Sequence, residues 1–366
     1  MKILNITSIT ELRGGDTQMY TVYNLLKEKS DLKQYILCPD NSTLAKICKK
    51  DNANFFTYNK NAFKLFNLVV TIIDICKKES IDILHIHDSS ALNAGLIAVK
   101  FLNKSTTLIL SRKRNNSIKE KFLNRYKYSH PRIEKIICVS KAVESIFDKI
   151  ILDKERLITI YDGIDVEKFA QNTNKKLLHA EYKFSSDTKI IGNIAGLTNQ
   201  KDIYTFIDTA KKIKAKNDTG HPIKFVIIGD GPLKDDLIKY TIKNDLENDI
   251  FFTGFRSVPD LLPEFNVFLS TSITEGLPLT VYEAFASRIP VVSTKAGGIP
   301  EVVSDGETGF LAALKDAETL SKRVLEILIN PSLEENIKVN AYNLVKQNHD
   351  LCVMQKHYYD FYKTLS

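Results

Sequence analysis

The sequence predicts an α/β protein built from two Rossmann-like domains that face each other across a cleft. Short β-branched runs alternate with helix-like stretches, which is the pattern of a parallel sheet covered on both faces. The alternation pauses in the polar stretch 163–187 and then restarts. The chain has 366 residues, of which 43% are hydrophobic, and this is enough apolar material for two separate cores.

We expect an N-terminal domain over residues 1–165 and a C-terminal domain over 166–346, with the linker within 163–187. The last helix, 347–366, is expected to pack back on the first domain. The expected strands of the first domain are 2–7, 34–38, 81–87, 106–110, 135–140 and 156–160. Those of the second domain are 188–196, 223–229, 249–254, 266–270 and 290–294.

Between the strands of the first domain, residues 61–77 form the clearest expected helix. Its apolar side chains recur at three- and four-residue spacing, which predicts one face packed on the core. The alternative is a helix face that lies on a membrane. The residues of this face are Phe66, Val69, Val70 and Ile73.

Several classes of protein are excluded by composition. The longest uncharged runs, 89–99 and 190–200, are shorter than the roughly 20 residues that span a bilayer, so no transmembrane helix is expected. The first residues resemble a buried strand rather than a signal peptide, which predicts a cytoplasmic protein. The cysteines are odd in number and form no C-x-x-C pair, so we interpret them as small buried hydrophobic residues: Cys38, Cys48, Cys76, Cys138 and Cys352.

Positive charge is concentrated in residues 100–135, which hold eleven Lys and Arg against only Glu120 and Glu134. Such a patch predicts contact with an anionic partner, in particular an anionic membrane surface. The alternative is a charged surface that only keeps the protein soluble. No zinc-finger spacing, RNP-like strand or heptad accompanies the charge, so no nucleic acid is expected.

The richest loop follows the expected strand 266–270. A helix that begins near Thr280 would point unpaired N–H groups at an anion, and Gly276 would let the backbone approach it, so we expect a diphosphate pocket here. Glu275 would place a carboxylate beside sugar hydroxyls. Two alternatives stay open, because Glu275 could be a solvated loop acid and Thr280-x-x-Glu283 fits a capping box.

The segment EGLPLTVYEAFASRIPVVSTKAGGIPEVVSDGETGFL, with Glu-x7-Glu at 275 and 283, resembles the donor-site signature of the fourth family of retaining glycosyltransferases (group 1), which have the GT-B fold. The resemblance covers most of the chain. It includes, in order, RGGDTQ, IICVSKAV, TIYDGID, GLTNQKD, VIIGDGPL and FFTGF.

This resemblance implies roles for individual residues. Glu275 would hold hydroxyls of the transferred sugar, and Glu283 would hold the ribose. Lys201 would neutralise the diphosphate, on which negative charge develops as the glycosidic bond breaks. The backbone of Gly276, Leu277 and Leu279 would bind the same diphosphate.

Other loops match the family through their glycines. Gly14 and Gly15 resemble the turn that approaches the donor phosphate and the acceptor, and Gly15 would thereby take part in catalysis. The loop from Gly254 to Arg256 resembles a main-chain site for the base, whereas Gly229 and Gly231 look architectural.

The chain departs from the family pattern at three positions. Gly196 replaces a common Arg, and Asp162 replaces a common Asn. The usual His after the fourth strand is missing, so Arg112 or Arg114 would fill that corner. His85 and His87 alternate along strand 81–87, so only one is expected on a given side; His87 is a further candidate contact, although both look like strand-end polar groups.

The resemblance implies a retaining hexosyltransferase without a protein nucleophile. Because the chain contains no D-x-D triplet, we expect no metal, and the nucleotide-sugar is a substrate rather than a cofactor. The expected reaction moves a sugar from a UDP- or GDP-sugar to a glycan or lipid-linked acceptor, such as a lipopolysaccharide or glycolipid precursor, at the cytoplasmic membrane face. The rivals are a non-catalytic sugar-nucleotide binding or assembly subunit and a nucleotide-sugar 2-epimerase.

Overall fold

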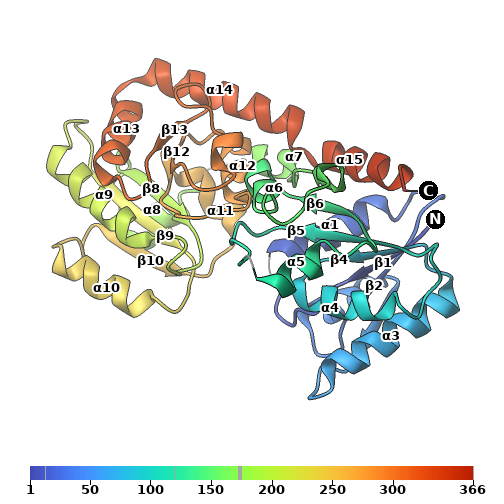
Figure 1. The fold of residues 1–366 in the computed structure, drawn as a ribbon. Coiled ribbons are helices and arrows are strands. Elements are labelled where there is room, and N and C mark those ends of the chain that lie inside the picture. The colour runs from blue at the N-terminus through green and yellow to red at the C-terminus, as the bar shows by residue number, and fades with distance from the viewer. Residues whose placement is uncertain (13, 120, 172–174, 366) are drawn as a thin grey trace. The chain divides into compact units, whose positions relative to one another are not determined.

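The chain forms two compact units, which are described here from a computed structural model (Figure 1). One unit comprises Met1–Asp162 and Met354–Ser366, and the other comprises Gly163–Val353. The expected division after residue 165 lies close to the first of these boundaries. The structure describes residues 1–12, 14–119, 121–171 and 175–365; Arg13 of the RGGDTQ motif, Glu120 of the basic stretch, residues 172–174 of the expected linker and Ser366 lie outside them.

The first unit is built on a seven-stranded parallel sheet in the order β3-β2-β1-β4-β5-β6-β7. The strand order reverses between β1 and β4, and such a switch point is where parallel sheets of this kind bind ligands, outside the carboxyl ends of the strands. The strands are β1 (Lys2–Ile6), β2 (Lys33–Pro39), β3 (Phe55–Tyr58), β4 (Ile83–Ile86), β5 (Thr107–Arg112), β6 (Ile133–Cys138) and β7 (Leu157–Thr159).

Helices cover both faces of this sheet. Helices α3 and α4 pack against each other, and α1 and α2 share a core cluster with β2. The helices are α1 (Gly14–Leu26), α2 (Thr43–Lys50), α3 (Lys64–Glu79), α4 (Ser89–Ala98), α5 (Phe122–Tyr128), α6 (Lys141–Ser145) and α15 (Leu351–Lys363), with a 3-10 turn at Lys154–Arg156.

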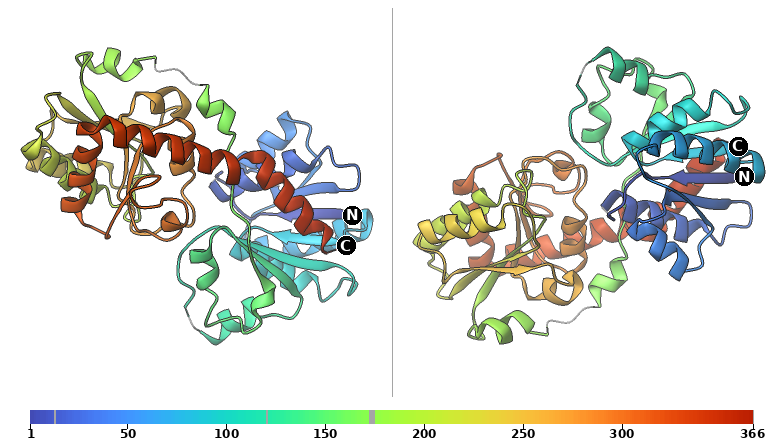
Figure 2. Two further views of the ribbon diagram at one scale, coloured as in Figure 1. Left: turned by 90° about the horizontal axis from the view of Figure 1, so that it is seen from above. Right: turned by 90° about the horizontal axis from the view of Figure 1, so that it is seen from below.

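The end of the chain belongs to the first unit from Met354 onward, whereas residues 347–353 of the expected helix 347–366 belong to the second unit (Figure 2). In α15, the Gln355 amide donates a hydrogen bond to the carbonyl of Leu25 in α1, and the ring of Tyr362 is fully buried. Four of the cysteines are buried as expected, but the prediction is wrong for Cys352, which lies on an exposed turn of α15.

The second unit repeats the same topology with six parallel strands, in the order β10-β9-β8-β11-β12-β13. Its switch point lies between β8 and β11, where Val267 pairs with Ile191. The strands are β8 (Lys189–Ile194), β9 (Ile223–Ile228), β10 (Ile250–Gly254), β11 (Val267–Ser270), β12 (Val291–Thr294) and β13 (Phe310–Ala312).

One face of this sheet is covered by α9, α10 and α13, and the other by α7, α8, α11, α12 and most of α14. Two separate apolar clusters, one on each face, explain why the strands are hydrophobic throughout rather than alternating. The helices are α7 (Val166–Ala170), α8 (Leu177–Tyr182), α9 (Ile203–Lys216), α10 (Lys234–Lys243), α11 (Val258–Leu261), α12 (Leu279–Ala286), α13 (Ala317–Ile329) and α14 (Pro331–Asn348), with 3-10 turns at Leu262–Glu264 and Ile299–Glu301.

The interpretation of 163–187 as a linker is wrong in the described part of that stretch. Helices α7 and α8 lie within it, and the side chains of Val166, Phe169 and Leu178 are buried in the core of the second unit. Each helix has fewer than two turns, which is too short for a hydrophobic period to emerge from the sequence.

The prediction of which face of helix 61–77 packs on the core is also wrong. Phe66 is 67% exposed and Val70 is 38% exposed, although Val69 is buried. The face that packs on the core lies one stripe further round α3: Leu68, Val69, Ile72, Ile75 and Cys76. No helix of the described residues is long and apolar enough to cross a membrane.

Candidate functional site

Two residues expected at the donor site meet at the switch point of the second unit. Lys201 lies in the loop after β8 and Glu275 in the loop after β11, and these loops leave the same edge of the sheet. The Lys201 Nζ lies 2.5 Å from Glu275 Oε1. The side chains of Lys201 and Glu275 remain 28% and 11% exposed, so the pair is partly accessible to solvent. A lysine has three donors, so Lys201 can hold Glu275 and still bind an anion.

The loops around this ion pair are tied together by hydrogen bonds. Ser272 Oγ donates to the same Glu275 oxygen at 2.6 Å, and Gly298 N donates to the Glu275 carbonyl at 3.2 Å. The amide of Ile273 bonds to the carbonyl of Gln200 at 2.9 Å, which joins the β11 loop to the β8 loop. The Glu275 carboxylate is therefore held in one position. The hydrogen bond from Ser272 to Glu275 was not expected from the Glu-x7-Glu motif.

Helix α12 begins at Leu279, and the first amides of a helix have no partner within the helix. Pro278 is its N-cap, and no side chain of the described residues caps the helix. The partly buried side chains of Leu277 and Leu279 pack against the apolar core and anchor this segment. An uncapped helix start of this kind is a favourable place for a diphosphate. The capping-box alternative is excluded, because Thr280 lies inside the helix and makes no cap hydrogen bond.

Glu283 lies one turn into α12 and is deeply recessed. Burial raises the pKa of its carboxyl to about 7, although Lys168 nearby lowers it. No side chain of the described part of the chain donates a hydrogen bond to Glu283. A recessed carboxyl without a donor is suited to bind a ligand that brings its own hydroxyl donors.

The glycines in the loops after β8 and β9 have an architectural explanation. A Cβ on Gly229 would lie 2.0 Å from the carbonyl oxygen of Ala195, and one on Gly231 would lie 2.6 Å from that of Leu197. The two loops therefore approach each other too closely for side chains. A Cβ on Gly196, which replaces the family's Arg, would lie 3.9 Å from its nearest neighbour, so the backbone there leaves room for a side chain.

The expected base site after β10 is only partly available. Gly254 has a φ of +71°, a conformation that favours glycine whether or not a ligand is present. Arg256 forms an ion pair with Glu181 at 3.1 Å, and its charge is thereby occupied within the second unit. Phe255 between them is 91% exposed.

In the first unit, Gly14 and Gly15 form the start of α1. Neither has a positive φ, a Cβ on Gly14 would meet nothing within 4 Å, and one on Gly15 would only touch the side chain of Lys113 at 3.5 Å. The fold therefore does not require glycine here, in contrast to Gly229. The expected approach of a ligand to Gly14 and Gly15 stays a prediction.

The loop that follows β5, where Arg112 or Arg114 was expected to act, also contains a lysine that the sequence analysis did not identify. Lys113 is buried and pairs with Asp162, and its Nζ also lies 3.2 Å from the Tyr358 hydroxyl. Burial lowers the pKa of Lys113, but Asp162 and Tyr358 more than offset it, so the ammonium stays charged. The ion pair with Lys113 thus gives a structural reason for Asp162, where the family commonly has Asn. Of the expected residues, Arg114 is exposed and Arg112 half-buried.

His85 and His87 do not point to opposite sides, and this prediction is wrong. Strand β4 ends at Ile86, so the alternation stops before His87, and the two rings lie side by side with centroids 4.0 Å apart and planes tilted by 35°. His85 bonds to Tyr362 and Ser111, both at 2.7 Å, and burial lowers its pKa to about 3. His85 is therefore structural. His87 Nε2 contacts Asn5 at 3.1 Å, and its buried Nδ1 has no hydrogen-bond partner among the described residues.

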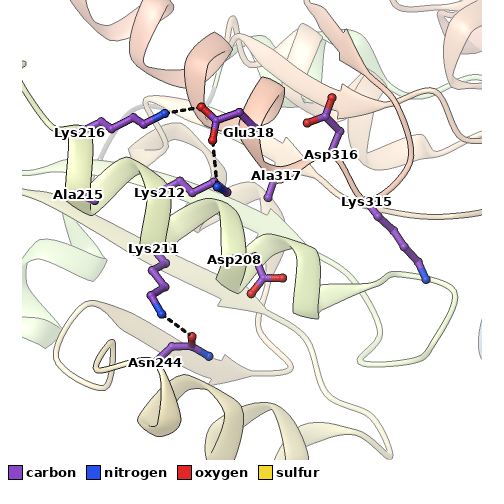
Figure 3. A pocket seen from close by; sticks show the side chains of 10 residues that line it. All are labelled: Asp208, Lys211, Lys212, Ala215, Lys216, Asn244, Lys315, Asp316, Ala317 and Glu318. Atoms are coloured by element: carbon purple, nitrogen blue, oxygen red, sulfur yellow. Dashed lines mark hydrogen bonds and ion pairs between the residues drawn. The ribbon is translucent and has the colours of Figure 1, made fainter.

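A separate pocket of about 660 Å³ lies at the C-terminal half of α9 (Figure 3). Its charges are largely satisfied within the protein, since Lys212 and Lys216 both pair with Glu318, and Lys211 bonds to Asn244. We therefore do not assign a ligand to it. In the described residues, no group of three or more His, Cys, Asp and Glu side chains is placed to hold a metal ion.

Comparison with known proteins agrees with this architecture. Residues 174–344 match the model of Glycosyl transferases group 1, and residues 21–168 match that of Glycosyltransferase Family 4. An uncharacterized glycosyltransferase of Methanocaldococcus jannaschii is 28% identical over 97% of this chain and 96% of its own. The Escherichia coli UDP-Gal:alpha-D-GlcNAc-diphosphoundecaprenol alpha-1,3-galactosyltransferase is 25% identical over 95% and 94%.

Solved structures show the same fold. Anabaena HepE, in complex with UDP and glucose, is 18% identical and covers 100% of both chains with a TM-score of 0.84. A Rickettsia africae glycosyltransferase is 22% identical, with a TM-score of 0.86 over 100% of this chain and 98% of that one. The chain therefore belongs to the group 1, family 4 glycosyltransferases and has their two-Rossmann-domain GT-B fold.

Proposed function

We propose that this glycosyltransferase is a retaining hexosyltransferase that uses a UDP-sugar, or less favourably a GDP-sugar, and transfers the sugar to a glycan or a lipid-linked acceptor at the cytoplasmic membrane face. The second unit binds the donor and the first unit binds the acceptor. The observation that carries the proposal is the Lys201–Glu275 ion pair at the switch point, beside the uncapped start of α12.

On this proposal the donor rearranges an existing ion pair rather than creating a new one. The diphosphate accepts hydrogen bonds from Lys201 and from the backbone amides of Gly276, Leu277 and Leu279; Pro278 between them has no N–H to donate. Glu275, held by Ser272, then accepts hydrogen bonds from sugar hydroxyls. A cation at the diphosphate stabilises the charge that develops on the leaving group, so Lys201 acts most strongly in the transition state.

The choice of UDP is supported by the printed names of relatives. The E. coli galactosyltransferase is named for UDP-Gal and for a diphosphoundecaprenol acceptor, and HepE was solved with UDP and glucose. A thermal-shift series with UDP, GDP and their sugars tests it, because a ligand that binds only the folded protein raises the melting temperature. If GDP but not UDP raises the melting temperature, the donor is a GDP-sugar rather than a UDP-sugar, and the proposed reaction class is unchanged.

Catalysis is distinguished from mere binding by the variant Glu275→Gln. A transferase loses turnover while UDP binding survives, whereas a non-catalytic binding or assembly subunit has no turnover to lose. The replacement of the family's Arg by Gly196 is the feature that makes this rival worth testing. Incubation with donor and no acceptor, followed by analysis of the sugar, tests the 2-epimerase alternative.

Retention follows if the acceptor hydroxyl attacks from the face that the diphosphate leaves and a phosphate oxygen takes its proton. The new glycosidic bond forms as the bond from the anomeric carbon to phosphate breaks, so no protein nucleophile is needed. Proton NMR of the transfer product gives the anomeric configuration of the new glycosidic bond. An inverted product would contradict this mechanism.

The membrane part of the proposal concerns residues 100–135. Helix α5 and its surroundings combine basic side chains with large exposed apolar ones, and this combination is typical of surfaces that bind anionic lipid. The exposed fractions are 65% for Phe101, 81% for Phe122, 75% for Leu123 and 57% for Tyr126. Flotation with phosphatidylcholine liposomes, with and without phosphatidylglycerol, tests it; equal binding to both would remove the electrostatic part.

A further inference from the structure

Helix α3 has a second apolar stripe, which faces solvent over most of its length. A surface helix of a globular protein normally has one apolar stripe, packed on the core, and a polar opposite side. The second stripe of α3 has the three- and four-residue spacing of one helix face. Its members are Phe63, Phe66, Val70 and Ile73. Phe63 is 71% exposed, Phe66 and Val70 are also exposed, and Ile73 is half-buried.

Exposed apolar side chains on the other described helices are mostly single. The helices α4, α8, α10, α13 and α14 each expose one large apolar residue, which is normal for a protein surface. Among the described helices, only α3 and α5 expose more than one. In α3 these are Leu65, Phe66 and Val70, and Phe63 precedes them as the N-cap. Apolar side chains gathered in this way mark a surface that binds a partner or a membrane.

The exposed stripe begins near the carboxyl edge of the first sheet. Strand β3 ends at Tyr58, and residues 59–63 lead from this end into α3. Lys60 Nζ donates a hydrogen bond at 2.5 Å to the carbonyl of Ser8, in the loop that follows β1. The start of α3 therefore lies at the edge of the sheet where ligands of such sheets bind.

The charge around the two phenylalanines is positive. Residues 52–73 include Lys60 and Lys64 but no acidic residue, and the acids of α3, Asp74 and Glu79, lie in its C-terminal half. Aromatic and aliphatic side chains beside lysines are typical of a helix that lies in the interface of an anionic membrane. A symmetric contact between two copies of the chain would instead bring the lysines of one copy against those of the other.

We propose that the start of α3 is a membrane-binding surface, on which Phe63, Leu65 and Phe66 insert among the headgroups of an anionic bilayer and Lys64 contacts lipid phosphate. The inference deepens the proposed function and rests on its acceptor at the membrane face. It adds a contact outside residues 100–135. This contact holds the carboxyl edge of the first sheet at the bilayer, where a lipid-linked acceptor would reach it.

The test uses a single introduced indole, because the chain contains no tryptophan. Phe66→Trp is mixed with vesicles of phosphatidylcholine and phosphatidylglycerol whose acyl chains are brominated. We expect a blue shift of the emission and quenching by the brominated lipid, since the indole enters the membrane interface. Leu152→Trp is the matched control and is expected to show neither effect. Leu152 is 94% exposed and precedes β7, at the opposite edge of the sheet.

Flotation with unbrominated vesicles of the same composition measures the energetic weight of these side chains. The double variant Phe63→Ser with Phe66→Ser is expected to bind about tenfold more weakly or worse, because two large apolar side chains are lost. Lys64→Gln is expected to bind about fivefold more weakly. Lys50→Gln removes an exposed charge from α2 and should change binding less than twofold.

A parallel variant, Phe122→Trp, separates this surface from residues 100–135. Quenching of Phe66→Trp supports the inference, whether or not Phe122→Trp is quenched. If only Phe122→Trp is quenched, the membrane contact of the proposed function stands and this inference is overturned. If neither is quenched, both membrane contacts are overturned. A wild-type dimer in light scattering that the double serine variant dissociates would assign the stripe to a second copy and overturn the membrane surface.

Discussion

Replacing Glu283 by glutamine is expected to make the protein more stable at pH 8 and a poorer donor binder. The pKa of this carboxyl is raised from 4.5 to about 7 by burial. A raised folded-state pKa gives stability that is full below the unfolded pKa and is lost as pH rises to the folded one. The charged form therefore costs about 3 kcal/mol at pH 8, from about 1.4 kcal/mol per pKa unit.

Glutamine resembles the protonated carboxyl, so Glu283→Gln should have about the stability of the wild type at pH 5. Its advantage should grow to about 3 kcal/mol at pH 8, which is roughly 8 °C in the midpoint of the second unit. Differential scanning calorimetry at the two pH values measures this. A difference that does not change with pH would refute the burial argument.

The same titration is expected in donor binding. Only the carboxylate accepts hydrogen bonds from both ribose hydroxyls, so affinity for UDP-glucose should fall about tenfold from pH 8 to pH 6 in the wild type. In Glu283→Gln the affinity should be weak and nearly independent of pH. Calorimetric titrations at both pH values test this, and equal pH dependence in the two proteins would exclude Glu283 as the ribose acceptor.

Three further predictions follow from the contacts. Glu275→Gln should lower turnover about a hundredfold and change UDP affinity less than about threefold, and equal losses in both would contradict a role in the transition state. Asp162→Asn leaves Lys113 without its counter-charge and should destabilise the first unit by about 3 kcal/mol; addition of Lys113→Met should recover most of this in a double-mutant cycle, and additive effects would contradict the pairing. Gly229→Ala places a methyl 2.0 Å from the Ala195 carbonyl and should lower the melting temperature by several degrees, whereas an unchanged value would argue against the close approach.

The long strands of both sheets could be predicted from the sequence, because buried parallel strands are continuous apolar runs. The edge strands β3 and β13 could not. Their shortness is not the whole reason, because the three-residue edge strand β7 was expected. Phe55–Tyr58 has only one buried residue among four, so it does not stand out as a buried apolar run. Their pairing with β2 and β12 is set by the sheet that already exists.

Some contacts of the candidate site could likewise be predicted from the sequence, and others could not. Lys201 and Glu275 could be placed together in advance, because loops after neighbouring parallel strands leave one edge of the sheet. The contacts of His85 with Tyr362 could not, since the partner lies 277 residues away in a helix that returns to the first unit. The pairing of Lys113 with Asp162 likewise depends on tertiary packing across 49 residues.

The central claim is tested most directly by a crystal structure of the protein with a bound UDP-sugar. We expect both phosphates within hydrogen-bonding distance of Lys201 Nζ and of the amides at the start of α12, with Glu275 on the hexose and Glu283 on the ribose. Phosphates bound at another place, with the carboxylates of Glu275 and Glu283 free of the ligand, would contradict the account.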